Sequence, residues 1–268
     1  MRTRSSLALN GIELHSIDAA IYVRGVDEAS PSRNILAGAK GTGEGQFVNK
    51  ISRQYRDISV RFAIWATKYQ IARRAEIVQR VNAWAAPGGI LTVNYRDGQQ
   101  MRVKCTQLAA MKTDDWNEEY QISFRAYEVP YWENTDRTQI SVTTASQYAY
   151  LNYPGSAEGK LSFTGSNTSG YACNRIIIGT VDGNNNFLTK FDLSSLDLVN
   201  NETIVADYDE RDILRIRIRN SVGEYRSALG RRTPDSSDDI RLKYGSNKLS
   251  IWSHQSLAWN IYTYGRFE

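Results

Sequence analysis

Histidine and cysteine are scarce in this chain of 268 residues, which contains two of each. His15 and His254 lie far apart, and neither has a partner at the spacing of a metal-ligand motif, so we expect no metal site. No G-x-S-x-G motif is present, so a Ser-His-Asp triad is not expected. Cys105 and Cys173 form no C-x-x-C pair, and we expect reduced thiols. The sequence therefore predicts no cofactor and no catalytic residues.

Long apolar runs are also missing, and none approaches the ~20 residues of a membrane-spanning helix. The first 18 residues are basic but have no continuous apolar core, so we expect no signal peptide and a chain that folds in the cytosol. Lys and Arg number 33 against 29 Asp and Glu, without a basic block, which does not indicate nucleic-acid binding. Hydrophobic residues at 41% and 16 tyrosines indicate a folded, β-rich protein.

Two loops imitate ligand-binding motifs and fail on inspection. The stretch "GAKGTGEGQF" lacks the G-K-[ST] ending of a phosphate-binding loop, so a flexible loop is expected there. Asp182, Asn184 and Asn186 match the first ligands of a calcium loop, but Phe187 and Leu193 stand where glycine and glutamate are needed. Carboxylate pairs in polar loops leave a hydrolase unsupported, since glycosidases hold two carboxylates across a cleft.

The first half predicts antiparallel strands with one helix. In "DISVRFAIWA", Ile58, Val60, Phe62 and Ile64 alternate with residues of the other face, as in a half-buried strand. A helix follows, whose apolar face we predict from residues three and four apart: Ile71, Ala75, Val78, Val81 and Ala85. "ILTVNY" and "MRVKCTQL", joined by Arg96-Asp97-Gly98-Gln99, predict a hairpin. This is an α+β domain, residues 1–133.

Residues 27 to 50 interrupt this domain with four glycines, a proline and little periodicity. Excursions of this length are usually functional or disordered. We therefore expect a long segment that leaves the compact body.

The second half, residues 134–268, predicts strand after strand and no helix. In "ILRIRIRN", Leu214, Ile216 and Ile218 alternate with three arginines, so one face is core and the other carries guanidinium groups. Short strands between polar turns indicate a β-sandwich. The polar stretch from Asn134 to Gly159 is expected to be a linker or a connecting strand.

A proline and two large aromatics follow the strand Tyr120–Ala126, in "DWNEEYQISFRAYEVPYW". We expect Pro130 to end the strand because it has no N–H to donate. Tyr131 and Trp132 would then pack at the junction with the second domain.

The remaining tryptophans of strand ends and turns are candidates for core positions, for a contact surface or for sugar stacking. In the second domain Trp252 and Trp259, with His254 as a polar neighbour, are the candidate sugar or partner contacts.

The order of these elements resembles the bacteriophage (siphovirus) distal tail proteins. The resemblance is carried by "DISVRFAIWA", by a helix ending in "VNAWAAPGG", by "ILTVNYRDGQQMRVKC" and by "WNEEYQISFRAYEVPYW". In the second half it is carried by "NYPGSAEG", "KYGSNKLSIWS" and "YTYGRFE". It spans nearly the whole chain, and it implies a ring-forming first domain followed by a galectin-like, jelly-roll sandwich. It also implies that the segment at about 27–50 is an extended arm that reaches a neighbouring subunit, and the candidate contact residues of this arm are Asn34, Ile35, Leu36, Phe47 and Val48.

The resemblance also implies a structural role without enzymatic activity. Such proteins form a hexameric ring at the tail tip that joins the tail tube protein to the hub, fibre or receptor-binding protein, and the tape-measure protein and DNA pass through the lumen. The protein would fold and assemble in the host cytoplasm and reside in the virion, in the baseplate. The alternative is a carbohydrate-binding module that attaches to host polysaccharide. The sequence does not separate a virion from a tail-like particle encoded by a bacterium.

Overall fold

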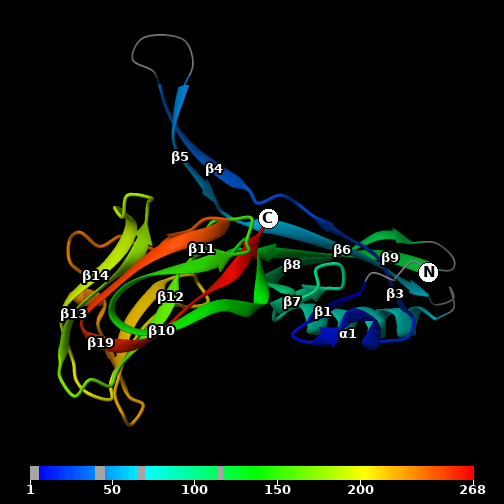
Figure 1. The fold of residues 1–268 in the computed structure, drawn as a ribbon. Helices are drawn as coiled ribbons and strands as arrows, with labels where there is room; N and C mark the ends of the chain where they lie inside the picture. Colours follow the sequence, from blue (N-terminus) through cyan, green and yellow to red (C-terminus); the bar gives the residue numbers. More distant parts are fainter. Residues whose placement is uncertain (1–5, 40–45, 66–69, 114–116) are drawn as a thin grey trace. The chain divides into compact units, whose positions relative to one another are not determined.

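The computed structural model describes the backbone of residues 6–39, 46–65, 70–113 and 117–268. It describes the side chains of the same residues except 33–53 and 112–117. The chain divides into two compact units, Met1–Glu133 together with Glu268, and Asn134–Phe267 (Figure 1). We refer to them as unit one and unit two and describe each by itself.

Unit one is built from antiparallel strands and one α-helix. Its described elements are β1 (Leu7–Leu9), β2 (Ile12–Glu13), the 3-10 turn η1 (Leu14–Ser16), β3 (Ile21–Glu28), β4 (Arg33–Ala39), β5 (Gln46–Arg53), β6 (Arg56–Trp65), α1 (Ile71–Ala85), β7 (Gly89–Val93), β8 (Gln99–Thr113) and β9 (Asn117–Ala126). Strands pair in the order β3-β6-β9-β8, and the start of β8 also pairs with β7, which pairs with β1. Ile58, Val60, Phe62 and Ile64 are fully buried, as the alternation predicts.

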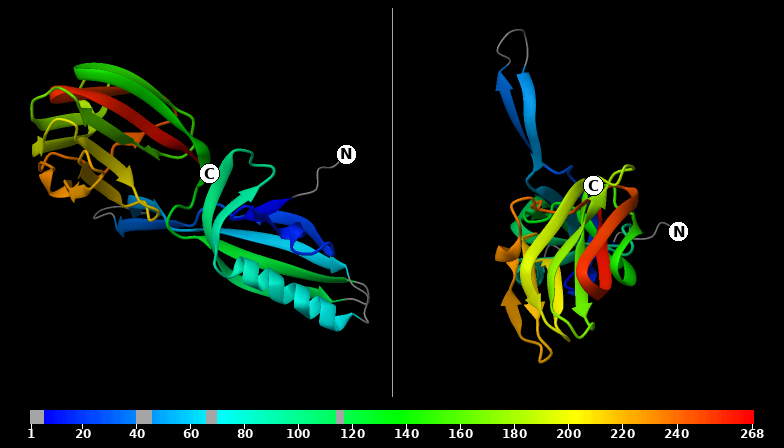
Figure 2. Two further views of the ribbon diagram at one scale, coloured as in Figure 1. Left: turned by 90° about the horizontal axis from the view of Figure 1, so that it is seen from below. Right: turned by 60° about the vertical axis from the view of Figure 1, so that its left-hand side comes forward.

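The helix α1 lies where the periodicity predicts it, but the predicted buried face is partly wrong. Its buried residues are Arg74, Ile77, Val81 and Ala85, while Ile71 is 71% exposed. Ala75 is exposed and Val78 half-buried. The reason is Arg74, whose Nη1 lies 3.2 Å from Oε1 of Glu118 on β9. This ion pair lets an arginine occupy the face that hydrophobicity alone assigns to neighbouring positions. Figure 2 shows α1 along one face of the strands.

The segment expected to be an aperiodic excursion, 27 to 50, consists mainly of strand. Asp27 and Glu28 complete β3, and β4 and β5 pair antiparallel with a register shift between Leu36 and Ala37. Residues 40–45, which include most of the expected flexible glycine-rich loop, lie outside the described residues.

Unit two consists of antiparallel strands around one core. After β10 (Trp132–Tyr153), which starts in unit one, come β11 (Gly159–Lys160), β12 (Ser162–Asn167), β13 (Cys173–Val181), β14 (Phe187–Leu198), β15 (Thr203–Tyr208), β16 (Leu214–Arg219), β17 (Tyr225–Ser227), the 3-10 turn η2 (Leu229–Arg231), β18 (Arg241–Leu242) and β19 (Gly245–Phe267). The stretch from Asn134 to Tyr153, for which a linker or a connecting strand was expected, is strand.

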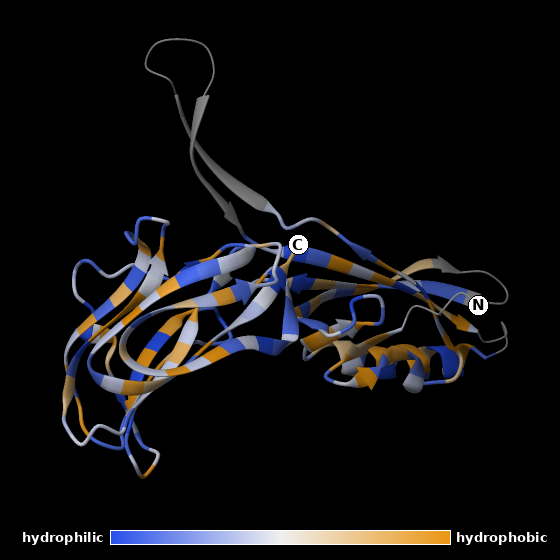
Figure 3. Cartoon of the chain, viewed as in Figure 1, coloured by the Kyte–Doolittle hydropathy of each residue, from blue (hydrophilic) through white to orange (hydrophobic). Residues whose placement is uncertain are grey.

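The long strand β19 joins two groups of strands. Leu249–Ser253 pair with β13, whose other neighbour is β14, and Leu257–Tyr262 pair with β12, which continues to β15, β16 and β17. Side chains of both groups share one core, for example Ile178 and Phe191 with Phe163 and Ile216. Unit two is therefore two layers of strands, and Figure 3 shows polar and hydrophobic residues alternating along them.

Candidate functional site

The arm candidates lie on a hairpin that pairs only with itself among the described strands. Asn34, Ile35 and Leu36 belong to β4, and Phe47 and Val48 to β5. The register pairs Leu36 with Lys50, Ala37 with Val48 and Gly38 with Phe47, so these residues face one another across one ladder. Figure 1 shows β4 and β5 as a ribbon that continues beyond the other strands of unit one.

The base of this hairpin is fixed to the sheet by hydrogen bonds. Ser32 donates its N–H to the carbonyl of Tyr55 at 2.7 Å, and Gln54 donates to the carbonyl of Ser32 at 3.0 Å. Ala29 donates to the carbonyl of Asp57 at 3.0 Å, and its own carbonyl accepts from Nε of the buried Arg56 at 3.1 Å. The strands that enter and leave the hairpin are thus held in register at its base.

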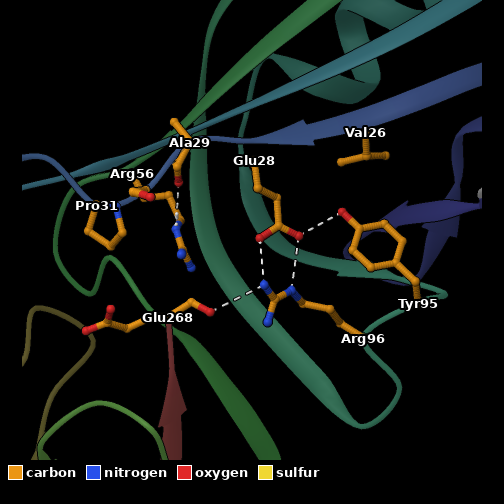
Figure 4. Close-up of a pocket in the computed structure, with 9 residues that line it drawn as sticks. Val26, Glu28, Ala29, Pro31, Arg56, Tyr95, Arg96 and Glu268 are labelled. Carbon is orange, nitrogen blue, oxygen red and sulfur yellow. Dashed lines mark hydrogen bonds and ion pairs between the residues drawn. The ribbon is translucent and has the colours of Figure 1, made fainter.

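The carboxylate of Glu28, beside the base of the hairpin, connects three segments of unit one by hydrogen bonds: the end of β3, the turn between β7 and β8, and the start of β10. Oε1 of Glu28 accepts from the Tyr95 hydroxyl at 2.7 Å and from Arg96 Nε at 3.0 Å (Figure 4). Its Oε2 accepts from Arg96 Nη2 and from Trp132 Nε1, both at 2.9 Å. The Arg96 guanidinium also lies over the Trp132 ring, 5.2 Å from the centroid. We call Glu28, Tyr95, Arg96 and Trp132 the Glu28 cluster.

The turn between β7 and β8 places Arg96 and Tyr95 in this cluster. Arg96 donates its N–H to Val93, Gln99 donates to Arg96, and Gly98 adopts a φ of 68°, which a glycine tolerates best. The predicted hairpin is therefore present, and its first turn residue carries the guanidinium.

The cluster holds Glu28 ionised. Burial alone would raise the pKa of Glu28, but hydrogen bonds from Arg96, Tyr95 and Trp132 outweigh it, and the pKa lies below its usual value. Burial and the hydrogen bond to Glu28 raise the pKa of the Tyr95 hydroxyl, so Tyr95 stays a neutral donor. A bidentate Arg–carboxylate pair at low exposure is among the stronger polar contacts in proteins.

A pocket with a volume of about 510 Å³ adjoins the Glu28 cluster. Residues of the arm base line it together with Tyr95, Arg96 and the terminal Glu268, whose main-chain oxygen accepts from Arg96 at 3.4 Å (Figure 4). Its walls are mostly polar and already paired with one another, so the arrangement suits anchoring the hairpin more than chemistry on a substrate. Among the described residues no group of three or more metal-ligating side chains converges.

Pro130, Tyr131 and Trp132 lie in and after the connection between β9 and β10. The strand β9 ends at Ala126, Pro130 is buried, Tyr131 is half-buried, and Trp132 is fully buried within unit one. The sequence indicates Trp132 as a junction residue, but it gives no signal for Glu28, which lies in the expected excursion, or for the side chain of Arg96, which lies in an expected turn.

The three sugar-contact candidates do not share one surface. All lie on β19, where Trp252 is 37% exposed and His254 is exposed, two residues apart on the outward face. Trp259 is 2% exposed, donates Nε1 to the Thr144 carbonyl at 3.1 Å and packs against Phe163. The odd spacing between 252 and 259 puts the two rings on opposite faces of the strand. Only Trp252 and His254 are offered to solvent.

The helix α1 has 15 residues, and no helix in the described part of the chain meets the length and apolarity required to cross a membrane.

Comparison with known proteins finds similarity in structure but not in sequence. No protein-family model matches the chain, and no curated protein sequence matches it. Two structures of the phage P2 baseplate in its activated conformation, with Ca and with Sr, give TM-scores of 0.47 and 0.48 at 5% and 6% identity. They cover 99% and 97% of this chain and 98% and 97% of theirs, but such scores do not establish a shared fold.

The Dit protein of phage SPP1, described as a paradigm of the hub adsorption apparatus in phages that infect Gram-positive bacteria, gives a TM-score of 0.73 at 13% identity. The match covers 99% of this chain and 100% of that one, so it includes both units. The chain is therefore Dit-like in fold, as the resemblance in its sequence implied.

Proposed function

We propose that this chain is a structural protein of a phage tail tip, with the role of a distal tail protein. The observation that carries the proposal is the likeness to the SPP1 Dit protein over the full length of both chains. If only one unit resembled the SPP1 Dit protein, the other unit could have a separate role. The similarity covers both units, which supports one common role for the whole chain.

Within this proposal, unit one forms a hexameric ring whose lumen lets DNA pass, and the β4–β5 hairpin reaches the neighbouring subunit. A closed ring needs two different patches that meet on successive copies. The hairpin suits one of these patches because its base is fixed by the Ser32 and Ala29 hydrogen bonds while its strands pair only with each other in the described chain. Asn34, Ile35, Leu36, Phe47 and Val48 would make the contact.

Unit two would then be the galectin-like, jelly-roll domain on the outside of the ring. The partners would be the tail tube protein, the hub, fibre or receptor-binding protein, and the tape-measure protein that passes the lumen. The protein would reside in the virion and carry no enzymatic activity. Pro130, Tyr131 and Trp132 would stiffen the exit towards unit two, since Trp132 is anchored to Glu28 where β10 begins.

The test is the mass of the purified full-length protein in solution, alone and mixed with tail tube and hub proteins. We expect six copies of the 30.3 kDa chain, about 182 kDa. A matched variant lacks residues 33–53 and joins Ser32 to Gln54 through two glycines, because these two residues are already hydrogen-bonded. It should keep the thermal unfolding of the parent and lose the ring.

Two results would contradict the proposal. A parent that stays monomeric alone and enters no ring with its partners would exclude the ring. A deletion variant that assembles as well as the parent would keep the ring but exclude the hairpin as the contact.

A further inference from the structure

Four arginines share the outer face of the sheet that β10, β19, β12, β15, β16 and β17 form in unit two. Arg215, Arg217 and Arg219 alternate along β16 with Ile216 and Ile218, which are buried in the core. Arg137 on β10 lies over the ring of Tyr262 on β19, 5.0 Å from its centroid. Because cross-strand partners share a face, the register places Arg217, Val205, Thr164 and Asn260 in one row.

The two borders of this face carry the large side chains. Tyr262 and Arg137 stand on one side, and the arginines of β16 with Tyr225 of β17 on the other. The electrostatic neighbours of Tyr262 include Asp207, Arg137 and Arg217, which agrees with a common surface. We call Arg137, Arg215, Arg217, Arg219, Tyr225 and Tyr262 the arginine face.

Between the borders, β12 and β15 present only short side chains. Ser162 pairs with Tyr262, Thr164 with Asn260 and Val205, and Ser166 with Thr203, whose hydroxyls lie 2.9 Å apart. Ser162 and Thr203 are buried although they point away from the core. Short hydroxyl residues therefore form a strip between the two borders, and Thr164 and Ser166 are the half-buried residues of this strip.

Positive charge exceeds negative charge on this surface. Asp207 is its acidic residue, with Oδ2 2.7 Å from Arg217 Nη2 and Oδ1 3.6 Å from Arg215 Nε. Arg137 and Arg219 have no ion pair within the described part of the chain. One carboxylate against four guanidinium groups leaves a surplus that an anionic ligand would neutralise.

The guanidinium groups are also held in position. Arg217 lies over Tyr225 at 4.7 Å, as Arg137 does over Tyr262, and cation–π contacts of this kind restrict the side chain. Successive arginines of β16 stand about 6.7 Å apart, two residues along a strand. A row of charges at this spacing fits an extended polymer with repeated anionic groups better than a single ion.

We propose that the arginine face binds an acidic polysaccharide, whose carboxylates or phosphates pair with the guanidinium groups while its hydroxyls bond to Thr164 and Ser166, the half-buried residues of the strip. The hydroxyl-lined strip favours this polymer over a nucleic acid or an acidic peptide. The activity belongs to unit two and does not depend on ring formation.

The test measures binding of the full-length protein to polygalacturonate by titration calorimetry. We expect binding that weakens from about 50 to about 200 mM NaCl. The variant Arg137→Gln/Arg219→Gln, which breaks no ion pair, should bind at least about tenfold more weakly. The control Arg231→Gln/Lys243→Gln removes the same charge from exposed positions off this sheet and should change affinity by less than about twofold.

Four results would overturn the proposal. No binding of polygalacturonate, or equal loss in the control variant, would exclude a specific site. Equal binding of neutral dextran would exclude recognition of the anionic groups. Tighter binding of single-stranded DNA or of polyglutamate would assign the face to another class of ligand.

Discussion

At the scale of single residues, Glu28 contributes most to the site. Its two oxygens accept four hydrogen bonds from side chains that are 67 to 104 positions away in the sequence. A buried carboxylate is costly unless it is paired, and here every bond stabilises the ionised form. The cluster therefore connects the base of the hairpin, the β7–β8 turn and the start of β10.

Trp132→Ala should destabilise unit one by about 3–5 kcal/mol, because the side chain is fully buried. Trp132→Phe should cost less, since it keeps most of the apolar contact and loses only the bond to Glu28. Chemical denaturation measures both, and limited proteolysis between residues 133 and 155 should increase in the alanine variant. Unchanged stability and cleavage would show that Trp132 does not anchor the exit.

The acid stability of the protein should depend on Glu28. Its folded pKa lies below the ordinary value of 4.5, so its contribution is present above that pH and is lost as pH falls through the folded pKa. Glu28→Gln should lower the melting temperature at neutral pH. The difference in melting temperature between the variant and the parent should decrease from about pH 5 to about pH 3. A gap that stays constant across this range would contradict the assignment.

Two tryptophans of β19 should respond differently to truncation. Trp259→Ala should cost about 3–5 kcal/mol because the ring is in the core, whereas Trp252→Ala should cost no more than about 1 kcal/mol. Urea titration of both variants gives the comparison. Similar losses would place both rings in similar environments and refute the alternation of faces.

At the scale of elements, local pattern predicted the strands and turns well and the helix face less well. Ile58 to Ile64 alternate as expected because β6 has a core on one side. The burial of Arg74 could not be read from hydrophobicity, since it depends on Glu118, which is 44 residues away. The hairpin β4–β5 was missed for another reason: residues 27 to 50 contain four glycines and a proline and show little periodicity, so the local pattern does not mark its two strands.

The orientation of α1 gives a direct test. Ile77→Ala should destabilise unit one by about 2–5 kcal/mol, while Ile71→Ala should be nearly neutral because Ile71 is 71% exposed. Thermal or urea unfolding of the two variants decides it. A larger loss of stability in Ile71→Ala than in Ile77→Ala would contradict this orientation and would support the buried face that the periodicity predicted.

At the scale of the whole molecule, the order of elements was more informative than any motif. The two units match the SPP1 Dit protein throughout at 13% identity, so the fold persists where few residues are shared. No set of side chains in the sequence specified the Glu28 cluster, because its members come from three distant segments. The buried position of Trp259 likewise followed from strand register, which composition does not contain.

Electron micrographs of the full-length protein, assembled alone or with its tail partners, test the central claim most directly. We expect class averages of a six-fold ring with an open centre, and we expect these rings to be lost when residues 33–53 are removed. Averages that show separate monomers, or closed particles without a central opening, would contradict it.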